Sequence, residues 1–175
     1  MKIVKTELNG GKPNFRVHIA IAPTKNIERI EWFLEKATEI GINRVTPLLC
    51  RFSERKEIKA ERLEKVMISA MKQSLKAYLP QLDELTRFNE FIQQPFDGQK
   101  YIAHCDNQHR DLLRNKVIPG QNYLILIGPE GDFSTEEIEL ALKHGFQPVS
   151  LGESRLRTET AGLVACHTVN LLNQF

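Results

Sequence analysis

The sequence predicts an α/β fold in which a parallel sheet carries helices on both faces. Several apolar runs are short and continuous, such as YLILI at 123–127, and such runs are typical of strands buried on both faces. Amphipathic segments with helical spacing separate these runs, and strands that alternate with helices favour parallel pairing. With 175 residues, 41% of them hydrophobic and 26% charged, the chain is long enough to bury one sizeable core.

Each predicted element follows from its own local pattern. The first helix repeats apolar residues at helical spacing, and Gly41 behind it suits a left-handed cap. Pro80 is predicted to stop the long second helix, whose lysines are typical of a solvated face. The expected elements are, in order, strand 15–22, helix 26–40, strand 44–50, helix 60–78, and strands 100–105, 123–127 and 148–151.

The composition indicates one domain. Residues 1–14 are polar and carry Gly10, Gly11 and Pro13, so we expect a lead-in there and a folded domain at 15–175. No apolar run reaches membrane length and the amino terminus lacks a signal-peptide apolar region, which favours a cytoplasmic protein. The net charge of +2 argues neither for nor against a polyanionic partner, so an RNA site would be a local patch.

The first candidate for ligand binding is the turn GPEGDFS at 128–134, directly behind an apolar strand. Ligands of open parallel sheets bind outside the carboxyl ends of the strands. Gly128 and Gly131 are predicted to take up positive φ and let the backbone approach a ligand, while Pro129 stiffens the turn. Ser134 and Glu137 have the spacing of a capping box. The alternative is a tight strand-to-helix turn without a ligand.

The second candidate is the turn LGESRLRTETA at 151–161, behind the last strand and before the last helix. Arg155 and Arg157 flank Leu156, and an apolar residue between charges would suit a wall for a flat ring such as adenine. The alternative is that Arg157 and Glu159 simply pair with each other at the start of the helix.

Other kinds of site have weaker support. His104, Cys105 and His109, and the pair Cys166 and His167, lack the spacing of a zinc site, so we predict no metal. The turn at 128–134 lacks the Lys and Ser/Thr of a P-loop, and the chain has neither a GxGxxG fingerprint nor a GxSxG nucleophile elbow.

Taken together, the two turns resemble the paired signature of the ribosomal RNA small subunit methyltransferase E family, which belongs to the SPOUT superfamily. Upstream, IEWFLEKATEIGINRVTP at 30–47 resembles that family's first helix and next strand, and Ser53, Glu54 and Arg55 its basic loop. The resemblance spans nearly the whole chain. It implies a SPOUT-type parallel sheet with a deep trefoil knot at the carboxyl end, and a homodimer that methylates N3 of a uridine in 16S ribosomal RNA.

The resemblance also implies the residues of a site for S-adenosylmethionine. Much of the contact with this donor would be made by backbone groups of the two turns and of the strand end near His104. The donor-binding residues carried over are His104, Ile127, Gly128, Pro129, Glu130, Gly131, Leu151, Gly152 and Leu156.

Catalysis by such a protein needs a cation that lowers the pKa of N3 and a carboxylate that accepts its proton. Arg157 and Glu159 are the candidates for these roles, with Arg155 as an alternative cation or phosphate contact. Phosphate contacts are predicted in the polar, basic connection at 51–59, at Arg51, Arg55 and Lys56.

The sequence departs from the family in several places. Relatives frequently have Gly where Leu75 and Asp132 stand, and Arg where Ser154 stands, one position before Arg155. The family usually carries an amino-terminal barrel resembling the PUA domain, of which residues 1–14 would be a remnant. We therefore expect donor binding with poor methylation of RNA. Two rival interpretations are a non-catalytic RNA-binding module and an α/β enzyme that binds another nucleotide at the GPEG turn.

Overall fold

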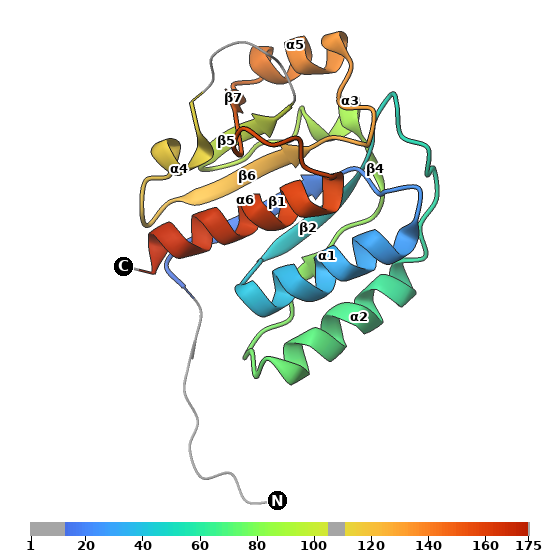
Figure 1. Ribbon diagram of the computed structural model, residues 1–175, viewed down its shortest axis with the longest axis vertical. Coiled ribbons are helices and arrows are strands. Elements are labelled where there is room, and N and C mark those ends of the chain that lie inside the picture. Colours follow the sequence, from blue (N-terminus) through green and yellow to red (C-terminus); the bar gives the residue numbers. More distant parts are fainter. Residues whose placement is uncertain (1–12, 105–110, 175) are drawn as a thin grey trace, which may run out of the picture.

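A computed structural model describes residues 13–104 and 111–174 and gives a seven-stranded sheet in which all strand pairs are parallel (Figure 1). The strand order is β3-β2-β1-β6-β5-β7, and β4 also pairs with β2. The strands are β1 Arg16–Ile21, β2 Arg44–Leu49, β3 Gln81–Leu82, β4 Thr86–Arg87, β5 Gln99–Ala103, β6 Asn122–Ile127 and β7 Gln147–Val149. The helices are α1 Ile27–Ile40, α2 Ala60–Gln73, α3 Phe88–Phe91, α4 Leu113–Lys116, α5 Thr135–Lys143 and α6 Thr158–Asn173.

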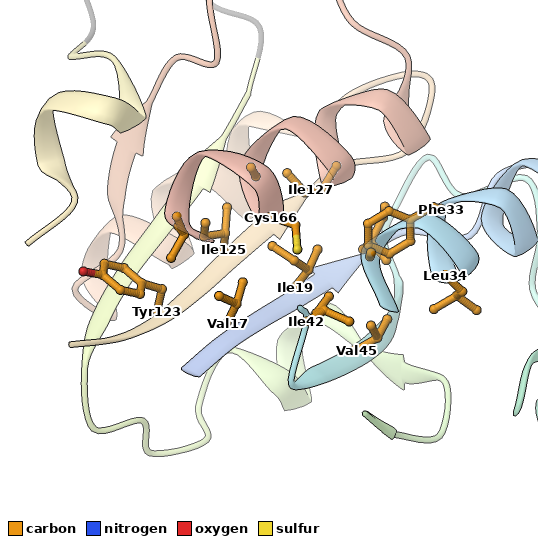
Figure 2. Packing of buried hydrophobic residues seen from close by; sticks show 14 of the residues in the cluster. Val17, Ile19, Phe33, Leu34, Ile42, Val45, Tyr123, Ile125, Ile127 and Cys166 are labelled. Carbon is orange, nitrogen blue, oxygen red and sulfur yellow. The ribbon is translucent and has the colours of Figure 1, made fainter. Parts of the chain in front are cut away.

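Neighbouring residues of the central strands point into two separate cores, as strand geometry requires. Ile19 and Ile21 belong to the core beneath α1, α2 and α6, where side chains of β1, β6, α1 and α6 converge (Figure 2). Ala20 and Ala22 belong to the core on the other face, which α3 and α5 cover. The prediction of a parallel sheet with helices on both faces is therefore confirmed.

Helix α1 begins and ends as predicted. Asn26 caps it by accepting a hydrogen bond from the backbone N–H of Glu28 at 3.0 Å, and Gly41 at φ 132° follows its last turn. The strands predicted in the sequence are all present, with bounds shifted by at most two residues.

The prediction for helix α2 was wrong at its end, because α2 stops at Gln73 rather than at 78. Leu75 has φ 56°, and the N–H of Lys76 donates to the carbonyl of Met71 at 3.0 Å, as in a left-handed helix cap. The chain has thus left the helix well before Pro80. The pieces β3, β4, α3 and α4 were not predicted, since two to four residues carry no periodicity.

Parallel pairing brings the carboxyl ends of three strands to one place. Ile127 of β6 lies beside Ile21 of β1 and beside Ala103 of β5. Behind these ends, α6 returns to pack on β1, β6 and α1, and a side chain at Gly162 would come within 2.8 Å of the Phe33 ring. None of the described helices is long and apolar enough to cross a membrane.

Candidate functional site

The two turns singled out in the sequence meet at this end of the sheet and enclose a pocket of about 240 Å³. One wall comes from the end of β6 and the turn behind it, and the other from the segment that leads into α6. The lining residues are Ala103, Ile127, Gly128, Pro129, Glu130, Asp132, Arg155, Leu156, Arg157, Thr158 and Ala161.

The first turn is closed by its own backbone, with the N–H of Asp132 donating to the carbonyl of Pro129 at 2.9 Å. The prediction that Gly128 and Gly131 adopt positive φ was wrong, because Asp132 occupies the left-handed position at φ 66°. Gly128 is required for another reason, since a Cβ there would lie 3.1 Å from the Phe133 ring. Tight packing against this buried ring therefore accounts for that glycine.

The predicted capping box at the start of α5 is confirmed. The hydroxyl of Ser134 accepts from the N–H of Glu137 at 3.2 Å, and the N–H of Ser134 donates to the Glu137 carboxylate at 2.9 Å. The other carboxylate oxygen of Glu137 accepts from the N–H of Arg51 at 2.8 Å. Glu137 thus ties the basic connection to the turn.

Two long-range hydrogen bonds hold the walls of the pocket in place. Thr158 at the start of α6 donates to the carbonyl of Gly128 at 3.0 Å, and this contact is buried. The N–H of Lys25, in the loop between β1 and α1, donates to the Glu130 carboxylate at 3.0 Å. That loop is held in turn by Arg55, whose guanidinium donates to the carbonyls of Thr24 at 3.0 Å and Lys25 at 2.6 Å.

The segment Arg155 to Arg157 also borders a second hollow of about 620 Å³ on its other side. This hollow lies between the start of α6 and one side of α1. Its lining residues are Asn26, Glu28, Arg29, Trp32, Arg155, Leu156, Arg157, Glu159 and Thr160. Arg155, Leu156 and Arg157 are therefore a wall shared by the two hollows.

Glu159 is the most unusual side chain of the second hollow, being only 7% exposed. One carboxylate oxygen lies 3.9 Å from Nε of Arg29, and no donor in the described part of the chain reaches the other oxygen, Oε2. No ion pair joins Glu159 to Arg157 among the described residues, so the alternative of a simple Arg157–Glu159 pair is not what the structure has.

The remaining residues predicted for donor binding, His104, Gly131, Leu151 and Gly152, do not line the pocket between the two turns. Leu151 and Gly152 line a third hollow of about 280 Å³, together with Leu112 and Leu113. Ala103, at the end of β5, lines the pocket, and Leu112, just before α4, lines the third hollow. The pocket and the third hollow therefore border the two ends of the connection between β5 and α4. His104 is half-buried and lines neither hollow.

Gly131 faces away from the pocket, toward Phe52, since a Cβ on it would lie 3.3 Å from Cβ of that side chain. Of the residues weighed as metal ligands, Cys105 and His109 lie outside the described residues. Burial raises the pKa of Cys166 to about 12, and His167 is exposed. No group of three possible metal ligands occurs in the described part of the chain.

The three residues predicted to contact RNA differ in their surroundings. Arg51 is exposed, with Nη1 3.5 Å from the Glu136 carboxylate, and Lys56 is also exposed. Arg55 is half-buried and already donates two hydrogen bonds to backbone carbonyls. Of these three residues, Arg51 and Lys56 are thus solvent-facing cations, and Arg55 holds a neighbouring loop.

The sequence did not single out Thr158, Arg29 or Trp32 as residues of the site. Trp32 carried a signal that could have been used, because it lies off the apolar spacing of its helix and is still 42% exposed. Nothing local marks Arg29, whose partner is 130 positions away in the sequence.

Fold and site together define a parallel α/β protein with a small-molecule pocket at the carboxyl ends of its central strands. The profile of the RNA methyltransferase domain family matches residues 11–170, and the chain belongs to this family. The resemblance noted in the sequence is thereby confirmed. Ribosomal RNA small subunit methyltransferase E of Rickettsia conorii is 28% identical over 156 residues, which cover 88% of this chain and 64% of the relative.

Two solved structures share the fold. A probable rRNA-methyltransferase from Porphyromonas gingivalis is 52% identical with a TM-score of 0.83, over 90% of this chain and 68% of that one. A putative methyltransferase from Legionella pneumophila, solved in complex with S-adenosylmethionine, is 30% identical with a TM-score of 0.84, over 91% of this chain and 67% of that one. The chain thus spans about two thirds of the length of these relatives.

Proposed function

We propose that this chain binds S-adenosylmethionine at the pocket between the two turns and methylates N3 of a uridine in 16S ribosomal RNA. The observation that carries the proposal is the meeting of GPEG and LRTET around one pocket at the carboxyl ends of β5 and β6. Membership of the RNA methyltransferase domain family and the donor complex of the Legionella pneumophila relative support it.

The residues of the pocket fit this donor. Ile127, Leu156 and Ala161 offer apolar surface for the adenine ring, while Glu130 and Asp132 are carboxylates that suit hydroxyl groups and positive charge. The sulfonium of the bound donor supplies an electrophilic methyl group. The protein's own task is to orient donor and acceptor in line and to exclude water.

The proton on N3 is the remaining barrier, and the shared wall carries the groups that act on it. Arg157 places a cation at the wall, which lowers the pKa of a nearby N3–H, and Glu159 accepts that proton on the side of the second hollow. Arg155, in the same wall, serves as a second cation or a phosphate contact.

Donor binding is tested by calorimetric titration with S-adenosylmethionine and, in parallel, with ATP and NAD. We expect binding of the methyl donor alone, and loss of it in Leu156→Arg. The matched control is Leu142→Arg, at a 43% exposed leucine of α5 that lines none of the three hollows. Preference for ATP or NAD would favour another nucleotide-binding enzyme, and a folded protein without donor binding would favour a non-catalytic RNA-binding module.

The catalytic roles are tested separately, by single-turnover methylation of 16S ribosomal RNA. In Arg157→Ala and Glu159→Gln we expect unchanged donor affinity together with a loss of methyl transfer of roughly a hundred-fold or more, as for removal of a general acid or base. Undiminished transfer in either variant would remove that residue from the mechanism.

We further propose that the protein is a homodimer and that its carboxyl end is knotted. The family resemblance supports both, and the passage of the chain from the edge strand β7 past the strand ends to α6 supports the knot. Sedimentation at micromolar concentration tests the dimer, and a monomer would count against it.

Lys56 and Arg51 are the proposed phosphate contacts, with Arg55 beside them, and salt-dependent RNA binding tests them.

A further inference from the structure

We infer that the second hollow, between α1 and the start of α6, is the site that receives the acceptor base, with Trp32 stacking on a uracil whose edge is recognised by Arg29, Glu159 and Arg157. This inference rests on the proposed function, because it names the acceptor side of the same site. The hollow of about 620 Å³ falls within the size range of small-molecule sites and shares its wall with the donor pocket.

The first observation is the unpartnered carboxylate oxygen. Oε2 of Glu159 is buried, and no described residue donates to it, although the side chain belongs to the lining of the hollow. A buried acceptor left without a donor costs free energy, so such a group points to a ligand that supplies an N–H or O–H. Among the edges of the RNA bases, uracil offers such a donor at N3, the atom that is methylated under the proposed function.

The second observation is that the hollow contains cations as well as that carboxylate. Arg29 and Arg157 line the same hollow, and both are donors only. The site therefore offers donor, acceptor and donor groups. The uracil edge, with O4, N3–H and O2, is their complement, whereas cytosine presents one donor and two acceptors, and guanine one acceptor and two donors. Of these three bases, the set formed by Arg29, Glu159 and Arg157 therefore favours uracil.

The third observation is the position of Trp32. It is the only tryptophan of the chain and lies on α1, one helical turn after Glu28 and Arg29. Its side chain is 42% exposed at the rim of a hollow that also holds charged groups. Exposed aromatic rings beside cations are the usual platforms for single-stranded bases.

Because Trp32 is the sole tryptophan, its fluorescence reports occupancy of the hollow directly. The probes are octanucleotides of uridine and of cytidine, which have the same backbone charge, added to the protein with S-adenosylhomocysteine present to prevent turnover. We expect quenching by both, with the uridine probe binding at least about ten-fold more tightly, in line with the discrimination of a well-paired base. In Arg29→Gln and Glu159→Gln the preference for uridine should shrink, and in the control Lys65→Gln, at an exposed cation of α2, it should not.

A kinetic test separates stacking from mere stability. Trp32→Ala should raise the KM for RNA roughly ten-fold, as for loss of one stacked base, with donor affinity unchanged, and Trp32→Phe should restore most of it. Intact donor binding without any quenching by the uridine probe would overturn the inference and leave the proposed function standing. If the fluorescence of Trp32 changes with protein concentration but not with added RNA, this face binds a second copy of the chain, and the inference is overturned as well. Absence of donor binding would overturn the proposed function and this inference together.

Discussion

Arg55 offers the clearest test of whether a basic residue near the site contacts RNA or shapes the donor pocket. Its guanidinium donates to the carbonyls of Thr24 and Lys25, and the N–H of Lys25 donates to the carboxylate of Glu130 in the pocket wall. Arg55 is thus two contacts away from Glu130, a residue of the pocket wall. We predict that Arg55→Ala and Arg55→Lys both weaken donor binding, because lysine keeps the charge but cannot reach two carbonyls in a fixed fork.

The magnitude follows from the two hydrogen bonds. Hydrogen bonds that involve a charged group contribute about 1.5–3 kcal/mol net when well buried. Here one acceptor, the carbonyl of Lys25, belongs to an exposed residue, so water replaces part of the loss and we expect about 1–2 kcal/mol in total. That corresponds to a fall in melting temperature of roughly 2–8 °C for a chain of this size. If the whole loss reaches the pocket, donor affinity falls by about 5- to 30-fold.

The assay pairs calorimetric titration of S-adenosylmethionine with a thermal melt for Arg55→Ala, Arg55→Lys and Lys56→Ala. Lys56→Ala is the matched control. It removes one charge at an exposed residue next to Arg55 and leaves the hydrogen bonds to the loop between β1 and α1 unchanged. We expect donor binding in Lys56→Ala to stay as in the unaltered protein. Full recovery of donor and RNA binding in Arg55→Lys would refute the clamp and favour a phosphate contact.

Three further predictions concern stability. Leu75→Gly should stabilise the protein by about 1 kcal/mol, because Leu75, just beyond α2, has φ 56° and is 90% exposed. Lys72→Gly, inside α2, should destabilise the protein by a similar amount, and equal losses of stability on chemical denaturation would contradict this. Gly162→Ala should cost about 1–3 kcal/mol, since the new Cβ would lie 2.8 Å from the Phe33 ring, and a neutral result would show that the ring moves aside. Burial lowers the pKa of His18 from 6.5 to about 4, so the unfolded chain takes up this proton first, and stability should fall by up to about 3 kcal/mol between pH 6.5 and 4. His18→Gln should flatten that pH dependence, and an unchanged slope would assign it to other groups.

The sequence was sufficient for the elements that are long or buried on both faces. Continuous apolar runs such as 123–127 and the spacing of α1 are local signals that depend on burial alone, and the structure has both. The strands β3 and β4 form only because β2 offers an edge to pair with, as at Arg44 and Gln81. Such short pieces are determined by tertiary contact, which no window of the sequence contains.

Two left-handed positions show how a substitution hides a backbone signal. Leu75 and Asp132 both have positive φ, and the family resemblance leads us to expect glycine at both positions. With glycine present, the end of α2 and the shape of the first turn could have been predicted from the conformational freedom of that residue. With leucine at position 75, helical spacing extended the predicted helix past its true end. With aspartate at position 132, positive φ was predicted for Gly128 and Gly131, whereas Asp132 is the residue that adopts it.

The candidate site was predictable where it consists of contiguous turns and unpredictable where it joins distant segments. In a helix the side chains at i and i+2 do not face each other, so the spacing of Arg157 and Glu159 gave no physical ground for an ion pair between them. The structure instead places Glu159 beside Arg29, with Arg157 lining the hollows on both sides of the wall. Because Arg157 is not ion-paired with Glu159, its charge can act on a bound base. The Glu159 oxygen that lacks a protein donor can accept a proton from that base. The separation of these two groups therefore supports the proposed roles of Arg157 and Glu159 in chemistry at N3.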